Sequence, residues 1–218
     1  MKLFFRKNLL FLILALLVPV FAGCEQGDSS KDYGFPLIYI PQATVTGLDN
    51  SYPIPNGPFG QNTAYTCYYE NGKLHIALGV VRAGAISHAK GFTVDLGLSP
   101  QQTDRKLTEL QEKGTPAIAM PVDLCEIPAR IAVESNKNTG TCYMTVDLQR
   151  LAAMQSSLYQ NGQYKLLVLG LEISNPSHYE LAEDNTSVVV ILDLNSEHWD
   201  NVPENLPESE VRYLFPIL

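Results

Sequence analysis

Four histidines and 23 acidic residues are the side chains of this 218-residue chain that could hold a metal ion or carry acid–base catalysis. The spacings that build such sites are missing from the sequence: there is no His-x-His, His-Glu-x-x-His, Cys-x-x-Cys, Gly-x-Ser-x-Gly or glycine-rich phosphate loop. His75 falls on the outward face of a predicted strand, where a solvated side chain is commoner than a metal ligand. The sequence therefore predicts no metal, no cofactor and no catalytic residue, in a protein that is not an enzyme.

A pair of carboxylates is the one catalytic arrangement that the sequence leaves open. Glycoside hydrolysis uses two acids about 5 to 9.5 Å apart across a cleft, and separate strands could supply them. The candidates are Asp95, Asp123, Glu134 and Glu172. Acidic side chains lie mostly on exposed surfaces, so a glycan-processing enzyme is the least favoured hypothesis.

Aromatic side chains offer a different chemistry, because the C–H face of a sugar ring can stack on a flat aromatic ring. The candidates for ligand binding are Tyr52 and Phe59 in a proline-rich loop, Tyr143, Tyr179 and Trp199. Ordinary packing in a core is the commoner role of such residues. Trp199 differs from the others, because it is the only tryptophan and lies in a polar segment, so a binding role and a packing role both stay open for it.

The first 24 residues have the pattern of an export signal that ends in a lipidated cysteine. A basic start is followed by 14 apolar residues, which span about 21 Å as a helix and fall short of the roughly 30 Å hydrocarbon core of a membrane. The segment Phe21-Ala22-Gly23-Cys24 resembles a bacterial lipobox, with Phe21 where Leu or Val is usual. We therefore predict lipidation of Cys24 and a lipid-anchored protein at the outer membrane or cell surface. A plain secretory signal is the alternative.

The rest of the chain is acidic. The net charge of −8 becomes −11 when residues 1–23 are removed, because they carry Lys2, Arg6 and Lys7 and no acid. A surface of this sign repels polyphosphate, so nucleic acid is excluded as a partner. The expected partners are the membrane, through the lipid anchor, and a polysaccharide or another outer-membrane protein.

Three cysteines remain after lipidation, namely Cys67, Cys125 and Cys142. An odd number in an exported chain leaves at least one unpaired. A bridge between Cys125 and Cys142 and a set of three reduced thiols both stay open.

From residue 37 onward the sequence predicts an all-β fold. Short runs rich in Val, Ile, Tyr and Thr are broken by Gly, Pro and Asn, as in a sandwich or barrel. The runs 65–70 and 73–82 flank Asn71-Gly72, which predicts a hairpin with a type I′ turn. The proline-rich segment 49–60 excludes a helix or a central strand. Further strands are expected around residues 92–96, 131–133, 142–146, 164–173 and 188–192, the last two as central strands covered on both faces.

Two short crossover helices are expected on the rim of this immunoglobulin-like β-sandwich. The first starts at Ser99-Pro100, with Gln102 completing a capping box, and closes at Gly114. The second covers residues 147–155.

The predicted organisation is a signal peptide at 1–23, a flexible tether at 24–36, one β-sandwich domain at 37–194 and a polar C-terminal tail at 195–218. The tail ends in alternating residues that could form an edge strand. Such a strand could complete the sheet of a neighbouring copy. An adhesin or pilus-like subunit assembled by strand exchange is therefore an alternative hypothesis.

Five short motifs are spread over most of the predicted domain: residues 37–41 (Leu-Ile-Tyr-Ile-Pro), residues 124–128, Asn161-Gly-x-Tyr164, Pro176-Ser-His-Tyr179 and Asn185-x-Ser187-Val-Val-Val190. Together with the lipobox and the acidic tether they resemble the domain-of-unknown-function 1735 type family, the N-terminal β-sandwich of Bacteroidetes surface lipoproteins. The resemblance implies a surface lipoprotein associated with glycan utilisation, and it supplies no catalytic or binding residues. We therefore expect a non-catalytic binding or accessory module that acts in glycan capture.

Overall fold

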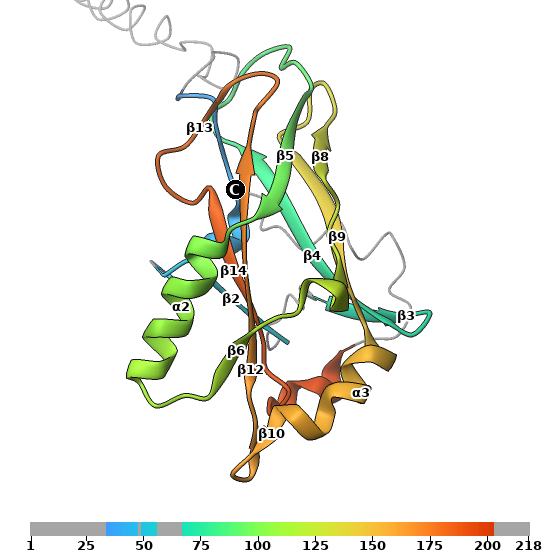
Figure 1. Ribbon diagram of the computed structural model, residues 1–218. Helices are drawn as coiled ribbons and strands as arrows, with labels where there is room; N and C mark the ends of the chain where they lie inside the picture. The colour runs from blue at the N-terminus through green and yellow to red at the C-terminus, as the bar shows by residue number, and fades with distance from the viewer. Residues whose placement is uncertain (1–33, 48, 56–66, 203–218) are drawn as a thin grey trace, which may run out of the picture.

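Two β-sheets packed face to face make up most of the computed structural model, which describes residues 34–47, 49–55 and 67–202 (Figure 1). The first sheet contains, in spatial order, β13 (Glu180–Leu181), β1 (Leu37–Tyr39), β4 (Lys73–Arg82), β9 (Thr139–Asp147) and β7 (Cys125–Glu126), and β3 (Cys67–Glu70) also pairs with β4. The second contains β2 (Ser51–Ile54), β14 (Ser187–Leu192), β12 (Leu166–Ser174), β5 (Phe92–Leu98) and β8 (Arg130–Val133), and β6 (Ala117–Ala119) also pairs with β12. The predicted all-β, immunoglobulin-like sandwich with short helices is confirmed.

The hairpin of β3 and β4 forms as predicted. Glu70 pairs with Lys73 across a turn in which Asn71 and Gly72 both have positive φ, as a type I′ turn requires. Alternate residues of β4 point between the two sheets, and those side chains are at most 1% exposed: Leu74, Ile76, Leu78 and Val80. The other face of this strand is therefore directed away from the main core.

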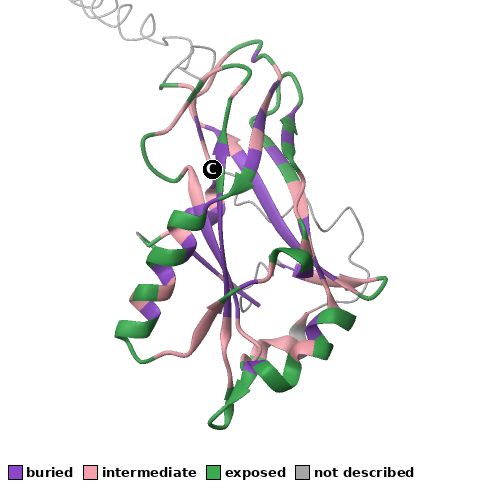
Figure 2. Ribbon diagram, viewed as in Figure 1, coloured by how far each residue is buried: buried purple, intermediate pink, exposed green. Residues whose placement is uncertain are grey.

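Helix α2 (Pro100–Glu112) lies over the outer face of the second sheet rather than at the rim of the sandwich (Figure 1). Leu110 of the helix forms a second, smaller hydrophobic cluster with Val168 of β12 and with Val189 and Ile191 of β14. The two central strands are therefore covered on both faces, as predicted, and their apolar character at nearly every position follows from this (Figure 2).

The start of α2 differs from the predicted capping box. The Ser99 hydroxyl donates a hydrogen bond of 2.8 Å to Glu172 on β12 instead of capping the helix. The helix is held against β12 at Gly170, whose N–H donates to the Thr103 hydroxyl. A Cβ atom at Gly170 would lie 2.5 Å from the Ser99 carbonyl oxygen, so glycine is what allows this close approach. The capping-box prediction is wrong because the sheet competes for the serine side chain.

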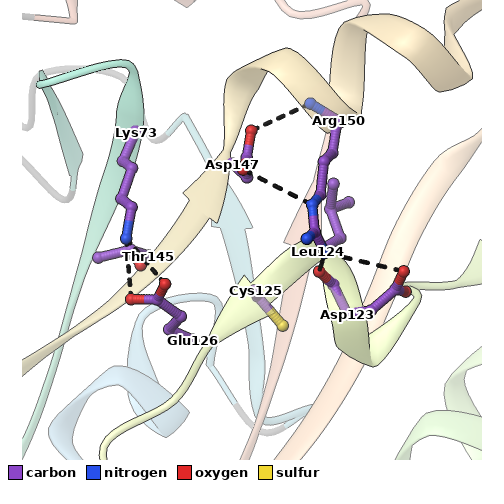
Figure 3. Close-up of a pocket in the computed structure, with 8 residues that line it drawn as sticks. All are labelled: Lys73, Asp123, Leu124, Cys125, Glu126, Thr145, Asp147 and Arg150. Carbon is purple, nitrogen blue, oxygen red and sulfur yellow. Dashed lines mark hydrogen bonds and ion pairs between the residues drawn. The ribbon is translucent and has the colours of Figure 1, made fainter.

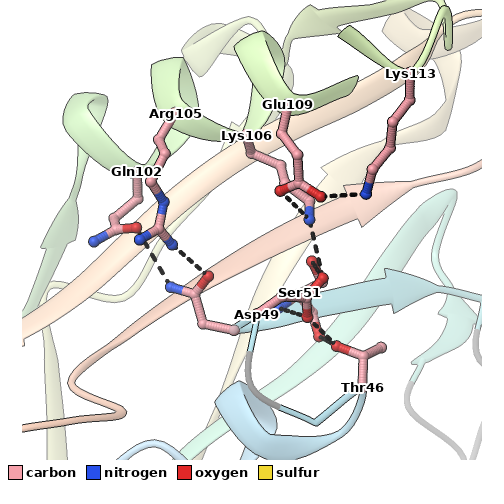
Figure 4. A network of polar contacts seen from close by, with 9 residues as sticks. Thr46, Asp49, Ser51, Gln102, Arg105, Lys106, Glu109 and Lys113 are labelled. Carbon is pink, nitrogen blue, oxygen red and sulfur yellow. Dashed lines mark hydrogen bonds and ion pairs between the residues drawn. The ribbon is translucent and has the colours of Figure 1, made fainter. Parts of the chain in front are cut away.

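A polar network joins the other side of α2 to the segment before β2 (Figure 4). The Lys106 side chain is 6% exposed, and its Nζ lies 3.0 Å from Asp49 and 2.9 Å from Glu109. Burial acts to raise the pKa of Asp49, but hydrogen bonds from Thr46, Lys106 and Ser51 outweigh it and hold the pKa well below its usual range. The helix is thus fixed by an apolar cluster on one side and by a buried ammonium group on the other.

The proline-rich segment contains β2, which runs parallel to β14 at the edge of the second sheet. An edge position tolerates Pro53, whose missing N–H would break the ladder of a central strand. This agrees with the prediction that no central strand passes through this segment.

Helix α3 (Leu148–Leu158) begins directly after β9 and ends three residues beyond its predicted end. Asp147 caps its N-terminus by accepting hydrogen bonds from the N–H groups of Gln149 and Arg150. Leu158 is fully buried and fixes the end of the helix to the main core. The two-stranded hairpin of β10 (Tyr159–Gln160) and β11 (Gln163–Tyr164) follows at once.

Among the described residues, no disulfide joins Cys125 to Cys142, so the bridge, one of the two open alternatives, is not formed. Burial raises the pKa of the Cys142 thiol to about 12. Among the described residues, no helix has the length and apolar character needed to cross a membrane. Cys24, the signal peptide and residues 211–218 lie outside the described residues, and the predictions made for them stay predictions.

Candidate functional site

The outward side chains of the first sheet form a continuous strip of polar and aromatic groups. Partly exposed residues that face away from the core alternate with buried ones along residues 73–76 of β4 and 143–147 of β9. Pairing between the strands places Tyr68 and Thr145 on either side of His75, and Glu70 and Asp147 on either side of Lys73. We call this strip the polar face, and it comprises Tyr68, Glu70, Lys73, His75, Tyr143, Thr145 and Asp147, with Glu126 of β7 at its edge.

Three rings meet at one end of the polar face. Tyr68 stacks on His75 with ring centroids 4.6 Å apart and 13° between the planes, and Tyr143 meets Tyr68 edge to face at 5.6 Å. All three side chains are half-buried, and burial, assisted by the nearby carboxylate of Glu70, raises the pKa of Tyr68. Glu70 also lies 3.8 Å from Nε2 of His75. These contacts hold the rings in fixed orientations beside a hydrogen-bonding group.

The other end of the polar face opens into a polar pocket of about 170 Å³ (Figure 3). Two cations project into a group of three carboxylates there. Lys73 lies 2.8 Å from Glu126, and Arg150 lies 3.7 Å from Asp147 and 3.9 Å from Asp123. Leu124, Cys125 and Thr145 complete the lining. The volume is below the 300–1,000 Å³ of a site for a drug-sized ligand, so the pocket fits one small polar group.

Five elements position the charges of the pocket, with Lys73 supplied by β4. Asp123 lies in the short 3₁₀ helix η3 (Val122–Leu124), and Glu126 follows on β7, paired with Thr145. Asp147 ends β9, and by capping α3 it brings Arg150, in the first turn of the helix, to the rim. The pocket is therefore built where the edge of the sheet meets a helix N-terminus.

The charge of the polar face and its pocket is negative. Among the described residues of the face and the pocket, the four carboxylates of Glu70, Asp123, Glu126 and Asp147 are accompanied by two cations, Lys73 and Arg150. The hydrogen bond from Lys73 lowers the pKa of Glu126, so this carboxylate stays charged at neutral pH. Together, the fixed rings and the charged hydrogen-bonding groups can hold a polyhydroxylated ligand by stacking and by hydrogen bonds.

The four acids considered for glycoside cleavage are divided between the two sheets. Asp95 on β5 accepts hydrogen bonds from Arg130 and Asn175, and Glu172 on β12 accepts one from Ser99. Glu134 follows β8 in the second sheet, whereas Asp123 lines the pocket of the first. Among the described residues, no group of three or more His, Cys, Asp or Glu side chains is arranged to hold a metal ion.

Of the five aromatic candidates, Tyr143 is the one that lies on the polar face. Tyr52 is 1% exposed in the main core, and its hydroxyl donates to the carbonyl oxygen of Ala77. Its ring is therefore inaccessible to a ligand in the folded protein, because β2 places it between the sheets. Phe59 lies outside the described residues.

The other two candidates contact the protein itself. Tyr179 donates to the carbonyl oxygen of Lys90, and the guanidinium of Arg82 lies 5.3 Å from the centre of its ring. Trp199, in the 3₁₀ helix η4 (Glu197–Asn201), packs against the main core, stacks on Tyr69 at 6.2 Å and donates its indole N–H to the carbonyl oxygen of Asp193. The polar neighbours of Trp199 suggested exposure, but the turn directs the indole inward.

Sequence reasoning missed most of the polar face. The hairpin pattern did place His75 outward and could have placed Tyr68 and Lys73 beside it. Glu126 and Arg150 carry no local signal, because only the pairing of β7 with β9 and the cap of α3 bring them to the pocket.

Comparison with known proteins gives matches in structure alone. No family model and no curated protein matches the sequence. Three similar solved structures come from Bacteroides, at 10 to 14% sequence identity. A Bacteroides ovatus protein provisionally described as carbohydrate-binding matches 72% of this chain and 37% of its own, with a TM-score of 0.45.

An auxiliary nutrient binding protein of Bacteroides thetaiotaomicron (14% identity) matches 67% of this chain and 45% of its own, with a TM-score of 0.42. A multidomain Bacteroides ovatus protein including DUF1735 (14% identity) matches 67% and 40%, with a TM-score of 0.38. The family that the sequence resembles is thus among the structural neighbours, and this chain spans less than half the length of each of the three.

Proposed function

We propose that this protein is a non-catalytic binding module that captures glycan at the bacterial surface through the polar face of its first sheet. The observation that carries the proposal is the fixed cluster of Tyr68, His75 and Tyr143 at one end of the polar face, with a pocket of charged hydrogen-bonding groups at the other. A sugar ring presents an apolar C–H face and several hydroxyl groups, and this arrangement offers a partner to each.

The location is proposed from the sequence. A basic start, a short apolar run and the segment ending at Cys24 support export and lipidation. Several acyl chains on one cysteine would hold the protein on the outer membrane, since each buried methylene contributes about 0.8 kcal/mol. Labelling with a radioactive fatty acid tests this proposal: wild-type protein should take up label, Cys24→Ala should not, and an unlabelled wild-type protein would contradict it.

Native affinity electrophoresis of the mature chain carrying Cys24→Ser tests the glycan proposal. The gels would contain neutral polysaccharides, namely xylan, galactomannan, β-glucan or mannan. We expect at least one of them to retard the protein, and Tyr68→Ala to weaken the retardation about threefold to tenfold through loss of one ring contact.

Tyr39→Ala is the matched control for Tyr68→Ala. Tyr39 is an outward-facing tyrosine of the same sheet, but it pairs with Val81 at the other end of β4. Its replacement should leave retardation unchanged. Equal loss in both variants would point to general damage to the sheet, and no retardation of the wild-type protein by any of the polysaccharides would refute the glycan proposal.

A further inference from the structure

The hairpin of β10 and β11 carries an exposed aromatic ring whose position is fixed. Four large apolar or aromatic side chains of the described residues are exposed, and Tyr159, 52% exposed, is the aromatic one that belongs to a helix or strand. It is directly paired with Tyr164 across the hairpin, and the two rings meet at 5.0 Å with 62° between their planes. The ring is therefore both accessible to solvent and held in one orientation.

Several polar contacts hold Tyr164, the residue that supports this ring. Asn195 accepts a hydrogen bond of 2.7 Å from the N–H of Tyr164 and donates one of 2.8 Å to its carbonyl oxygen. Gln155 of α3 donates to the Tyr164 hydroxyl at 2.6 Å. The support is therefore anchored from the helix and from the segment after β14, and Tyr159 rests against a fixed edge.

The tip of the hairpin is uncharged and rich in amide groups. Between the two tyrosines lie Gln160, Asn161, Gly162 and Gln163, all exposed, with Asn161 and Gly162 at positive φ in the turn (Figure 2). Amide side chains both donate and accept hydrogen bonds, as sugar hydroxyl groups do. A stable protein interface covers about 800 Å² on each partner, which is far more than one ring and three amides provide, so the tip fits a small neutral ligand better than a protein.

The hairpin lies at the opposite end of α3 from the pocket. Arg150, in the first turn of α3, lines the pocket, and Tyr159 directly follows the last residue of the helix. The 11 residues of α3 rise about 16 Å. A ligand that reaches both places must be an extended chain rather than a single sugar.

We infer that Tyr159 on the β10–β11 hairpin is a second contact for a neutral glycan chain whose first contact is the polar face. This inference rests on the proposed function and specifies its ligand as a polymer. The ring of Tyr159 stacks on one sugar of the chain, and the exposed amides of the turn bind its hydroxyl groups.

Dependence on chain length is the test. Affinity electrophoresis with the four neutral polysaccharides is combined with competition by the disaccharide and the hexasaccharide of whichever one binds. Tyr159→Ala should weaken binding of the polysaccharide and the hexasaccharide about threefold to tenfold and leave binding of the disaccharide unchanged. Tyr164→Phe loses the hydrogen bond from Gln155 and keeps the ring. It should weaken binding of the hexasaccharide by a smaller factor than Tyr159→Ala does.

The outcomes separate this inference from the proposed function. If Tyr68→Ala weakens binding and Tyr159→Ala does not, the polar face binds glycan and the second contact is refuted. If the wild-type protein binds none of the polysaccharides, both are refuted. A third outcome would also overturn the inference. In it, azidophenylalanine in place of Tyr159 crosslinks to a protein partner, and Tyr159→Ala leaves glycan binding unchanged. Because Tyr159 is exposed, its replacement should not unfold the protein, so weaker binding would reflect the lost contact. Thermal unfolding of each variant checks that the fold is kept.

Discussion

The ring of Tyr68 lies nearly parallel to the imidazole of His75, with 4.6 Å between the centroids and 13° between the planes. The two residues are direct partners across β3 and β4, so the backbone pairing of the hairpin sets the stack. The carboxylate of Glu70 lies 3.8 Å from the imidazole and belongs to the same strand as Tyr68. The ring proposed to contact sugar is therefore held in place by its cross-strand partner.

Replacing His75 should loosen that ring. We expect His75→Ala to lower the free energy of unfolding by about 0.5 to 1.5 kcal/mol, because an aromatic pair is lost, and to weaken glycan retardation. His75→Phe keeps a ring that can stack and should retain both. Urea unfolding and affinity electrophoresis measure the two effects, and equal behaviour of the two variants would show that the stack has no part in either.

Gly170→Ala should destabilise the contact between α2 and β12. The added Cβ would lie 2.5 Å from the Ser99 carbonyl oxygen and 2.8 Å from the Thr103 nitrogen, and backbone cannot move aside cheaply. Overpacking of this kind costs about 1 to 3 kcal/mol, measurable by urea unfolding. Gly97→Ala on the neighbouring strand β5 is the control, since an added Cβ there meets no atom of the described residues within 4 Å. A loss of stability in the control as large as in Gly170→Ala would contradict the steric explanation.

Acid should weaken the attachment of α2 through Asp49. The pKa of this carboxyl is lower in the folded protein than in the unfolded chain, so its contribution to stability is present above about pH 4 and is lost as the pH falls further. We expect Asp49→Asn to reduce the drop in the free energy of unfolding between pH 5 and pH 3. Asp104→Asn, at an exposed position of the same helix, should keep the wild-type drop. Parallel curves for wild type and Asp49→Asn would refute this role of Asp49.

The negative polar face should discriminate between glycans by charge. Its four carboxylates face two cations, so we expect neutral polysaccharides to be retained more strongly than pectin or other uronic acid polymers at low salt. Glu126→Gln removes one negative charge and releases Lys73 from its ion pair. The variant should therefore bind the acidic polymers better than the wild type. Stronger binding of pectin than of any neutral polymer by the wild type would contradict the prediction.

Local patterns predicted the strands well. The alternation in β4, the Asn71-Gly72 turn and the apolar runs of β12 and β14 each depend on neighbours in sequence, and all three are confirmed. The position of α2 was harder to predict from the sequence, because the docking of the helix depends on Gly170, some 70 residues away in the chain. The predicted cap of α2 was wrong for the same reason, because the Ser99 hydroxyl donates its hydrogen bond to Glu172, also far away in the chain.

The candidate site could be predicted only in part. Tyr143 was one of the aromatic candidates for ligand binding, and it does lie on the polar face. The hairpin register could have placed Tyr68 beside His75, but the contact between Tyr68 and Tyr143 requires the pairing of β9 with β4 as well. Trp199 is the opposite case, a residue that looked exposed and is packed against the core. The composition of its segment does not reveal that the turn directs the indole into the protein.

Asp147 belongs both to the pocket and to the N-terminal cap of α3. One carboxylate therefore couples the conformational stability of a helix to the shape of a binding site. Opening of α3 would dismantle the pocket and displace the Tyr159 hairpin together, while the ladders of the two sheets remain paired. Hydrogen exchange at the amides of α3 would then report how often the module is competent to bind, and a bound glycan chain should slow that exchange in proportion to its affinity.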